Sequence, residues 1–119
     1  IGLHRGFDRQ PRAERLARGL ERTFADHGLA CRTTHLGPIV RLFLSADPLD
    51  RAAAMRLPHR PIDAFHLALV TEGVLTIPGS NDFFLSFAHT DDDIDEIVAA
   101  AGRVLDRFDL AALGAPTVA

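Results

Sequence analysis

The sequence contains no lysine, only one cysteine and no long apolar run. All thirteen basic residues are arginines, so a mechanism that needs a lysine Schiff base or a phosphate-loop lysine is excluded within this chain. The single cysteine, Cys31, cannot form an internal disulfide, and nothing in the sequence requires an oxidising compartment.

Two further absences narrow the class of protein. No stretch approaches the roughly 18 apolar residues of a membrane span, and no signal peptide is recognisable. The formal net charge of −3 offers no basic surface of the kind that nucleic-acid-binding domains carry. We therefore expect a cytoplasmic protein that binds neither membranes nor nucleic acid.

The composition that is present fits one globular domain. The 119 residues, 47% hydrophobic and 24% charged, suffice for a single core. The chain starts at Ile1 with an irregular segment, which leads us to expect a piece of a longer protein. We expect a lead-in at residues 1–11, a domain core at 12–108 and a tail at 109–119.

The clearest local pattern lies between residues 74 and 108. Two apolar runs, 74–77 and 83–87, flank five turn-forming residues and predict a β-hairpin. Thr90 precedes Asp93 by three residues, as in a capping box, and opens a helix with an acidic first turn. The residues expected on its buried face recur at helical spacing: Ile94, Ile97, Val98, Ala101, Leu105 and Phe108.

An amphipathic helix is predicted after Pro11, ending near Gly28 as a left-handed cap. Arginines and glutamates alternate on its outer face, which we expect to be solvated. Residues 29–36 and 39–44 then predict two antiparallel strands. The apolar stripe of the helix comprises Ala13, Leu16, Ala17, Leu20 and Phe24.

Two more helices are predicted between the strands and the hairpin. Asp47-Pro48 resembles a helix start, with a short helix over residues 49–57. A longer helix runs from Pro61 to Gly73, and its expected inward residues are Ile62, Phe65, Leu69 and Val70. This order of elements predicts an α+β fold in which helices cover a small antiparallel sheet.

The reactive side chains do not form a recognisable site. The six histidines lack the spacing and the cysteine partners of zinc sites. We expect His66 to be a hydrogen-bonded core or boundary residue, and His89 to tie a strand end to a helix start. The acidic run 91–96 lacks the ligand pattern of a calcium loop, and no nucleophile elbow is present. Cys31 follows a helix C-terminus, where the dipole disfavours a thiolate, so we expect it to be inert.

Six short motifs follow one another along residues 12–108: His27-Gly28-Leu29, Leu36-Gly37-Pro38, Glu72-Gly73-Val74, Phe84-Leu85-Ser86, Ala88-His89-Thr90 and Asp93-Ile94-Asp95. As a set they resemble the C-terminal end of class III aminotransferases, which are pyridoxal-phosphate (PLP) enzymes of fold type I. The branch that fits them best is glutamate-1-semialdehyde 2,1-aminomutase.

This resemblance implies a small domain whose cofactor and cofactor lysine belong to a large domain upstream. No catalytic, cofactor-binding or metal-binding residue is then expected in this chain, and the implied partners are the large domain and further copies of the enzyme. The resemblance also places Asn81 where aminomutases carry a glutamate near the active site. We therefore expect Ser80, Asn81 and Asp82 to form a substrate-pocket loop. An amide in place of a carboxylate removes a charge and supplies two donors.

Two functions are open at this point. In the first, the chain is the C-terminal domain of a class III aminotransferase, which is an aminomutase or another transaminase. This domain is not catalytic by itself. Alternatively, the chain is a free-standing α+β module for binding or oligomerisation without enzymatic activity.

Overall fold

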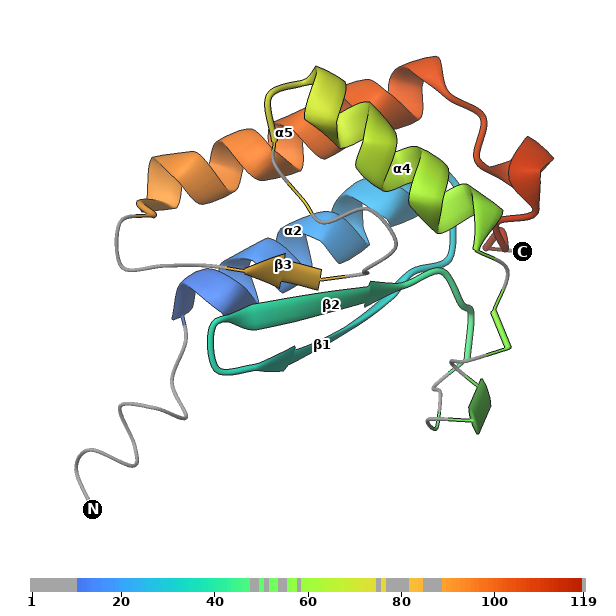
Figure 1. The fold of residues 1–119 in the computed structure, drawn as a ribbon, viewed down its shortest axis with the longest axis horizontal. Coiled ribbons are helices and arrows are strands. Elements are labelled where there is room, and N and C mark those ends of the chain that lie inside the picture. Colours follow the sequence, from blue (N-terminus) through green and yellow to red (C-terminus); the bar gives the residue numbers. More distant parts are fainter. Residues whose placement is uncertain are drawn as a thin grey trace.

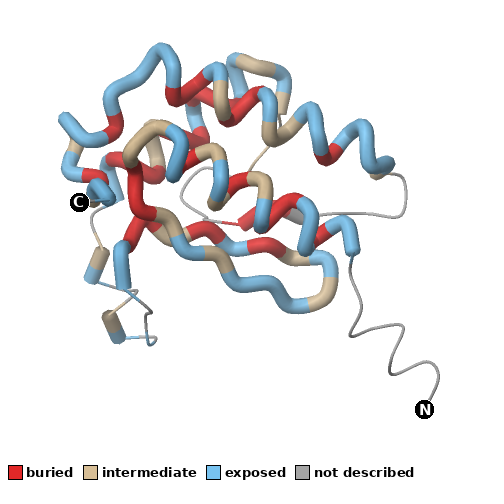
Figure 2. The backbone as a smooth tube through the Cα atoms, turned by 180° about the vertical axis from the view of Figure 1, so that it is seen from behind, coloured by how far each residue is buried: buried red, intermediate tan, exposed pale blue. Residues whose placement is uncertain are grey.

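Three helices cover one face of a three-stranded antiparallel sheet (Figure 1). The computed structural model describes residues 11–47, 50, 52–53, 56–57, 59–74, 76, 82–84 and 89–118. In chain order the elements are α2 (Pro11–Asp26), β1 (Arg32–Leu36), β2 (Ile39–Phe43), α4 (Arg60–Thr71), β3 (Asp82–Phe84), α5 (Asp91–Arg107) and the 3-10 turn η1 (Ala111–Leu113). Buried residues gather between the helices and the sheet (Figure 2). The predicted α+β class is confirmed.

Helix α2 forms where the apolar stripe predicts it. The five residues of that stripe are the buried residues of the helix, each fully inaccessible to solvent. Gly28 has φ +74°, a conformation that favours glycine, and the Leu29 N–H donates to the Phe24 carbonyl at 2.9 Å. The predicted glycine cap is confirmed.

Strands β1 and β2 form a hairpin across Gly37, which has φ +56°. Val40 and Leu42 are buried against the helices, while Arg41 between them is exposed on the other face. This alternation confirms that the second strand has one wet face.

The third strand has a different partner from the one that the sequence predicts. β3 pairs with β2, with Phe83 opposite Val40. Val74 and Thr76, the described residues of the predicted first strand of the hairpin, are not in a strand, and residues 75 and 77 lie outside the described part. The Val74 N–H instead donates to the Leu69 carbonyl at 3.0 Å. Val74 therefore closes the C-terminus of α4, and its N–H is not available to a ladder.

Helix α4 buries a face that is rotated from the predicted one. Val70 is 39% exposed, and the predicted inward position for it is wrong. The buried face follows the spacing i, i+3, i+4, i+7 from Ile62, which gives Phe65, His66 and Leu69. Val70 follows Leu69 and is turned about 100° further around the helix, so its side chain leaves this face.

Helix α5 begins with the predicted capping box. The Thr90 hydroxyl accepts the Asp93 N–H at 3.2 Å, and the Asp93 carboxylate accepts the Thr90 N–H at 2.7 Å. The bond from the Thr90 N–H, and then the Thr90 side chain, hold the pKa of the Asp93 carboxyl group below its usual value. Phe108, predicted on the buried face, is 46% exposed. The helix ends at Arg107 and the backbone of Phe108 is extended, so the Phe108 side chain leaves the apolar stripe. Val104, which the sequence analysis did not place on this stripe, is buried there.

Residues after Phe108, expected as a tail, pack onto the core. Leu110 and Ala115 are buried, and Thr117 forms a bridge with Leu29. The Val118 N–H donates to the Gly28 carbonyl at 3.0 Å. The last described residues are thus tied to the end of α2.

The predicted short helix over residues 49–57 is described only in part, at residues 50, 52–53 and 56–57. Ala52 and Ala53 are helical, and the Asp50 carboxylate accepts the Ala53 N–H at 2.7 Å. Asp47 makes a different contact, in which its N–H donates to the Ser45 hydroxyl at 3.2 Å. In the described ranges, no helix is both long and apolar enough to cross a membrane.

Candidate functional site

The predicted substrate-pocket loop leads directly into β3. Ser80 and Asn81 lie outside the described residues, and Asp82 is the first residue of the strand. Asp82 lies opposite Arg41 in the ladder. Its carboxylate accepts two bonds from the guanidinium, from Nε at 2.6 Å and from Nη2 at 2.9 Å. This bidentate pair fixes the start of β3 on β2.

The ion pair is buried on its acidic side only. The Asp82 side chain is 9% exposed and the Arg41 side chain 53%. The bond to Asp82 raises the pKa of Arg41, which is charged in any case. Asp82 therefore acts in the structure as an anchor for β3. Sequence reasoning did not find Arg41 as its partner, because the two residues are 41 positions apart.

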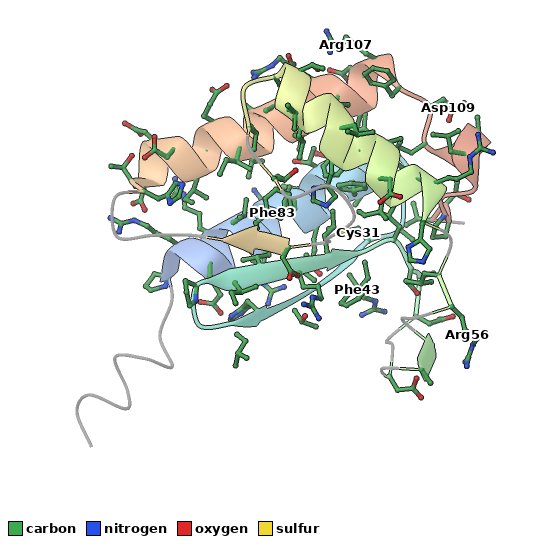
Figure 3. All side chains as sticks on the ribbon, in the orientation of Figure 1. Cys31, Phe43, Arg56, Phe83, Arg107 and Asp109 are labelled. Atoms are coloured by element: carbon green, nitrogen blue, oxygen red, sulfur yellow. The ribbon has the colours of Figure 1, made fainter. Side chains whose placement is uncertain are left out.

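No helix among the described residues covers the other face of the sheet. We call it the open sheet face; because side chains alternate along strands, its members on β1 and β2 are Arg32, Thr34, Leu36, Ile39, Arg41 and Phe43. Leu36 is 82% exposed, and Ile39 and Phe43 are half-buried. Figure 3 shows side chains projecting from the sheet on the side away from α4 and α5. Apolar and cationic groups thus share one uncovered surface.

His66 lies in the core, as predicted, beneath β3. Its ring is fully buried, with its centroid 5.7 Å from that of Phe65 and 5.3 Å from that of Phe83. No described residue gives a hydrogen bond to either ring nitrogen, so the expected hydrogen-bonded histidine is not found there. Burial lowers the pKa of His66 to about 4, although the negative charges of Asp63 and Asp82 act to raise it. The ring is neutral at physiological pH.

His27 joins the ends of α2 and α5. Its Nδ1 donates to the Thr23 carbonyl at 2.8 Å and its Nε2 donates to the Asp106 carboxylate at 2.7 Å. Both partners can only accept, so both bonds are made together only by the doubly protonated ring. The bond to the Thr23 carbonyl, and then the bond to Asp106, raise the pKa of His27. Sequence reasoning missed this pair, which spans 79 positions.

The charge on His27 should make stability depend on pH. A folded-state pKa above 6.5 means that the stabilisation is complete below about pH 6.5 and is lost as pH rises through the folded value. We expect the native chain to lose stability relative to His27→Gln as pH rises above 6.5, measured by urea unfolding. His35→Gln, at an exposed position of β1, is the control. Parallel pH profiles for the native chain and His27→Gln would contradict the double hydrogen bond.

The remaining candidates give no reactive site. Burial, and then the charge of Glu21, raise the pKa of the Cys31 thiol, which agrees with the expected inert cysteine. The main cause is thus burial, and not the helix dipole from which the sequence analysis argued. Among the described residues, no group of histidine, cysteine and carboxylate side chains could hold a metal. His89 precedes the cap of α5 and helps to lower the pKa of Asp93. Its contact with a strand end stays a prediction, because residues 85–88 are not described.

Removing Arg41 should cost more than removing a similar arginine on the surface. Arg41→Ala takes the guanidinium partner from a buried carboxylate, and we expect a loss of about 1–2 kcal/mol in the free energy of unfolding. Arg15→Ala is the matched control, because Arg15 makes the same bidentate bonds to Asp95 with both side chains about half exposed. Water can replace that pair, so its loss should be clearly smaller. Equal losses in urea unfolding would refute the anchoring role of Asp82.

Comparison with known proteins gives a consistent set of relatives. No family model matches the sequence. The chain is 36% identical over 92 residues to a glutamate-1-semialdehyde 2,1-aminomutase of Thermomicrobium roseum, covering 76% of this chain and 21% of that protein. It is 35% identical over 97 residues to the enzyme of that name from Desulfosudis oleivorans, covering 80% and 23%. The chain thus spans between a fifth and a quarter of the length of these relatives.

Solved structures share the fold. A β-phenylalanine aminotransferase from Variovorax paradoxus superposes with a TM-score of 0.76 at 23% identity, covering 91% of this chain and 24% of that one. An ω-transaminase from Sphaerobacter thermophilus gives a TM-score of 0.68 at 20% identity, covering 84% and 24%. In these structures the same arrangement of helices and strands is one part of a longer chain.

Proposed function

We propose that this chain, which is homologous to part of the glutamate-1-semialdehyde 2,1-aminomutases, serves as the C-terminal small domain of a PLP-dependent class III aminotransferase. The resemblance indicated by the six motifs is confirmed by these relatives. One observation carries the proposal: sequence relatives and structural neighbours agree on the same kind of enzyme, each over about a quarter of its length or less. The amino donor and acceptor are left open.

The residues of this chain do not fit the covalent cofactor site. The chain has no lysine, so it cannot hold PLP through a lysine nitrogen, and we propose that the chain alone binds no PLP. In such enzymes the cofactor stabilises the carbanion of amino-group transfer. We assign this chain a different part, which is to form a wall of the substrate pocket.

The wall that we propose is the end of the loop that enters β3. The pair between Asp82 and Arg41 fixes the first residue of the strand. Ser80 and Asn81 precede it directly in the sequence, and binding groups often lie on loops that rigid elements hold in place. We propose that Asn81 contacts the substrate through its amide.

We further propose that the rest of the parent enzyme packs on the open sheet face. The helices already cover the opposite face, while Leu36, Ile39 and Phe43 offer apolar surface with no cover among the described residues. Uncovered apolar surface of this kind is typical of interaction sites. In the isolated chain the same surface should promote self-association, and we propose a homo-oligomer for the parent enzyme.

A chimera tests the proposed function. The matched 92-residue segment of the Thermomicrobium roseum aminomutase is replaced by that of this chain, and PLP absorbance and amino-group transfer are measured. We expect the chimera to hold PLP and to transfer amino groups, while the same enzyme truncated before the segment does not. A folded chimera that is no more active than the truncated enzyme would refute the proposal.

The same chimera tests the pocket loop. Asn81→Glu and Asn81→Ala should change the ratio of kcat/KM between anionic and cationic amino donors, because glutamate adds a charge and alanine removes two donors. We expect both variants to lose selectivity for the anionic donor, and Asn81→Glu to lose more of it, because its negative charge also repels that donor. If both keep the selectivity of the unmodified chimera within about a factor of three, Asn81 is not in the pocket.

A further inference from the structure

His66 occupies a position where its polarity has no structural use. The ring is fully buried, and neither nitrogen has a hydrogen-bond partner among the described residues. The large majority of buried side-chain polar atoms in proteins have such a partner. A phenylalanine or leucine would fill the same space without the cost of desolvating two nitrogens. The position therefore favours a role that depends on the imidazole.

The ring supports the first residues of β3. The centroids of His66 and Phe83 are 5.3 Å apart, with the rings tilted by 41°. Phe83 is 4% exposed and lies opposite Val40 in the ladder, next to the anchor Asp82. Helix α4 thus contacts β3 through the pair of rings, at the end of the strand where the candidate pocket loop enters.

The charges that face His66 come from both packed elements, namely Asp63 on α4 and Asp82 on β3. Asp82 is already engaged by Arg41. A proton on the ring would place a cation in an apolar site, where a charge without a close partner is costly. The ring would relieve this cost by moving toward a carboxylate or water, and it would then leave Phe83.

We propose that His66 is a positioning residue, which holds Phe83 and the start of β3 in place when the ring is neutral and releases them when the ring is protonated. Only the consequence for a substrate pocket rests on the proposed function. Under that function, the pocket wall would be in place at neutral pH and displaced in acid. The contact itself belongs to the isolated chain and can be tested there.

The sign of the effect follows from burial. The folded-state pKa of His66, about 4, lies below the ordinary 6.5. The stabilisation that depends on the neutral ring is therefore complete above about pH 6.5 and is lost as pH falls through 4. This is the opposite direction from His27, so the two histidines can be separated by pH.

The test is a pH titration of the isolated chain by NMR, from pH 7.5 to about 3, so that it passes through the folded-state pKa of about 4. We expect the Phe83 amide and the His66 ring nitrogens to shift with one common midpoint, well below 6.5. In His66→Phe, which keeps an aromatic ring of similar size, the Phe83 shift should lose this component. Any part of the Phe83 shift that is due to the titration of Asp82 would persist in His66→Phe. The difference between the native chain and the variant therefore gives the contribution of His66. In the control variant His35→Phe, at an exposed position, the Phe83 amide should shift with pH as it does in the native chain.

Two results would overturn the proposal. One is a Phe83 titration that is unchanged in His66→Phe. The other, which needs no variant and so does not depend on its folding, is a native His66 ring that titrates while the Phe83 amide stays still. In the chimera, His66→Phe should reduce the loss of kcat/KM that is expected as pH falls. If the chimera is inactive but the NMR result holds, the positioning role stands and the proposed function falls.

Discussion

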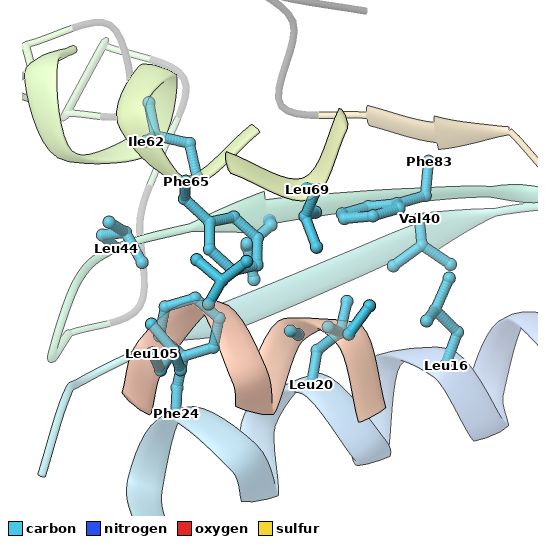
Figure 4. Packing of buried hydrophobic residues seen from close by; sticks show 14 of the residues in the cluster. Leu16, Leu20, Phe24, Val40, Leu44, Ile62, Phe65, Leu69, Phe83 and Leu105 are labelled. Carbon is cyan, nitrogen blue, oxygen red and sulfur yellow. The ribbon is translucent and has the colours of Figure 1, made fainter. Parts of the chain in front are cut away.

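Replacing Phe65 by alanine is expected to lower the free energy of unfolding by about 3–5 kcal/mol. Phe65 is fully buried, and its ring meets the edge of Phe24 with the centroids 5.0 Å apart. Figure 4 shows Phe65 reaching from α4 toward Phe24 and Leu105, so it joins the helices across the core. Truncation leaves a cavity that these well-packed neighbours can fill only in part. Urea unfolding followed by circular dichroism gives the loss.

Phe108→Ala is the matched control for the same substitution. Phe108 is 46% exposed, and the guanidinium carbon of Arg107 lies 5.7 Å from the centroid of its ring. An exposed contact of this kind contributes about 0.5–1 kcal/mol, so the variant should stay close to the native chain. Similar losses for the two variants would contradict the placement of Phe65 in the core and of Phe108 outside it.

Gly19→Ala is expected to lower the free energy of unfolding by up to about 2 kcal/mol. A Cβ at Gly19 would lie 2.6 Å from Cγ2 of Val98, where α2 and α5 pack together. Val98 cannot easily turn away, because a β-branched side chain in a helix has one strongly preferred rotamer. Overpacking of this kind costs about 1–3 kcal/mol, which exceeds the gain of up to about 1 kcal/mol from replacing a helical glycine. Thermal or urea unfolding measures the balance.

Gly102→Ala should have the opposite sign. Its Cβ would meet only Cγ2 of Thr23, at 3.7 Å, which is an ordinary contact. The gain in helix propensity then dominates, and we expect a stabilisation of about 0.5–1 kcal/mol. Adding Val98→Ala to the Gly19→Ala variant should recover part of the loss, as a double-mutant cycle would show. Stabilisation by both glycine substitutions would mean that the helices are not held at this close distance.

Much of the fold could be predicted because its signals are local. The stripe of α2, the glycine cap at Gly28 and the box between Thr90 and Asp93 each depend on residues within a few turns of one another. Hydrophobic periodicity and capping act over such distances, so the sequence alone contains them. The motifs that indicate the aminotransferase relatives are equally local. They indicated a resemblance to part of the glutamate-1-semialdehyde 2,1-aminomutases, which the sequence relatives then confirmed.

The candidate site was predicted only in part, because its groups meet through long-range packing. The sequence singled out Asp82, but not Arg41, which holds it from 41 positions away. It placed His66 in the core, but gave no sign that Phe83 covers the ring. Each of these pairs forms only after separate elements have packed, and no local periodicity encodes such a contact.

By itself, the sequence determined where α2, β1, β2, α4 and α5 lie, which turn needs a glycine, and that no lysine is present to hold a cofactor. Only the tertiary structure decided that β3 joins β2, and that Val70 and Phe108 face solvent. The physical reason is that secondary structure follows from local propensity and periodicity. Strand pairing and the exact buried face are set by competition among all surfaces for the one core.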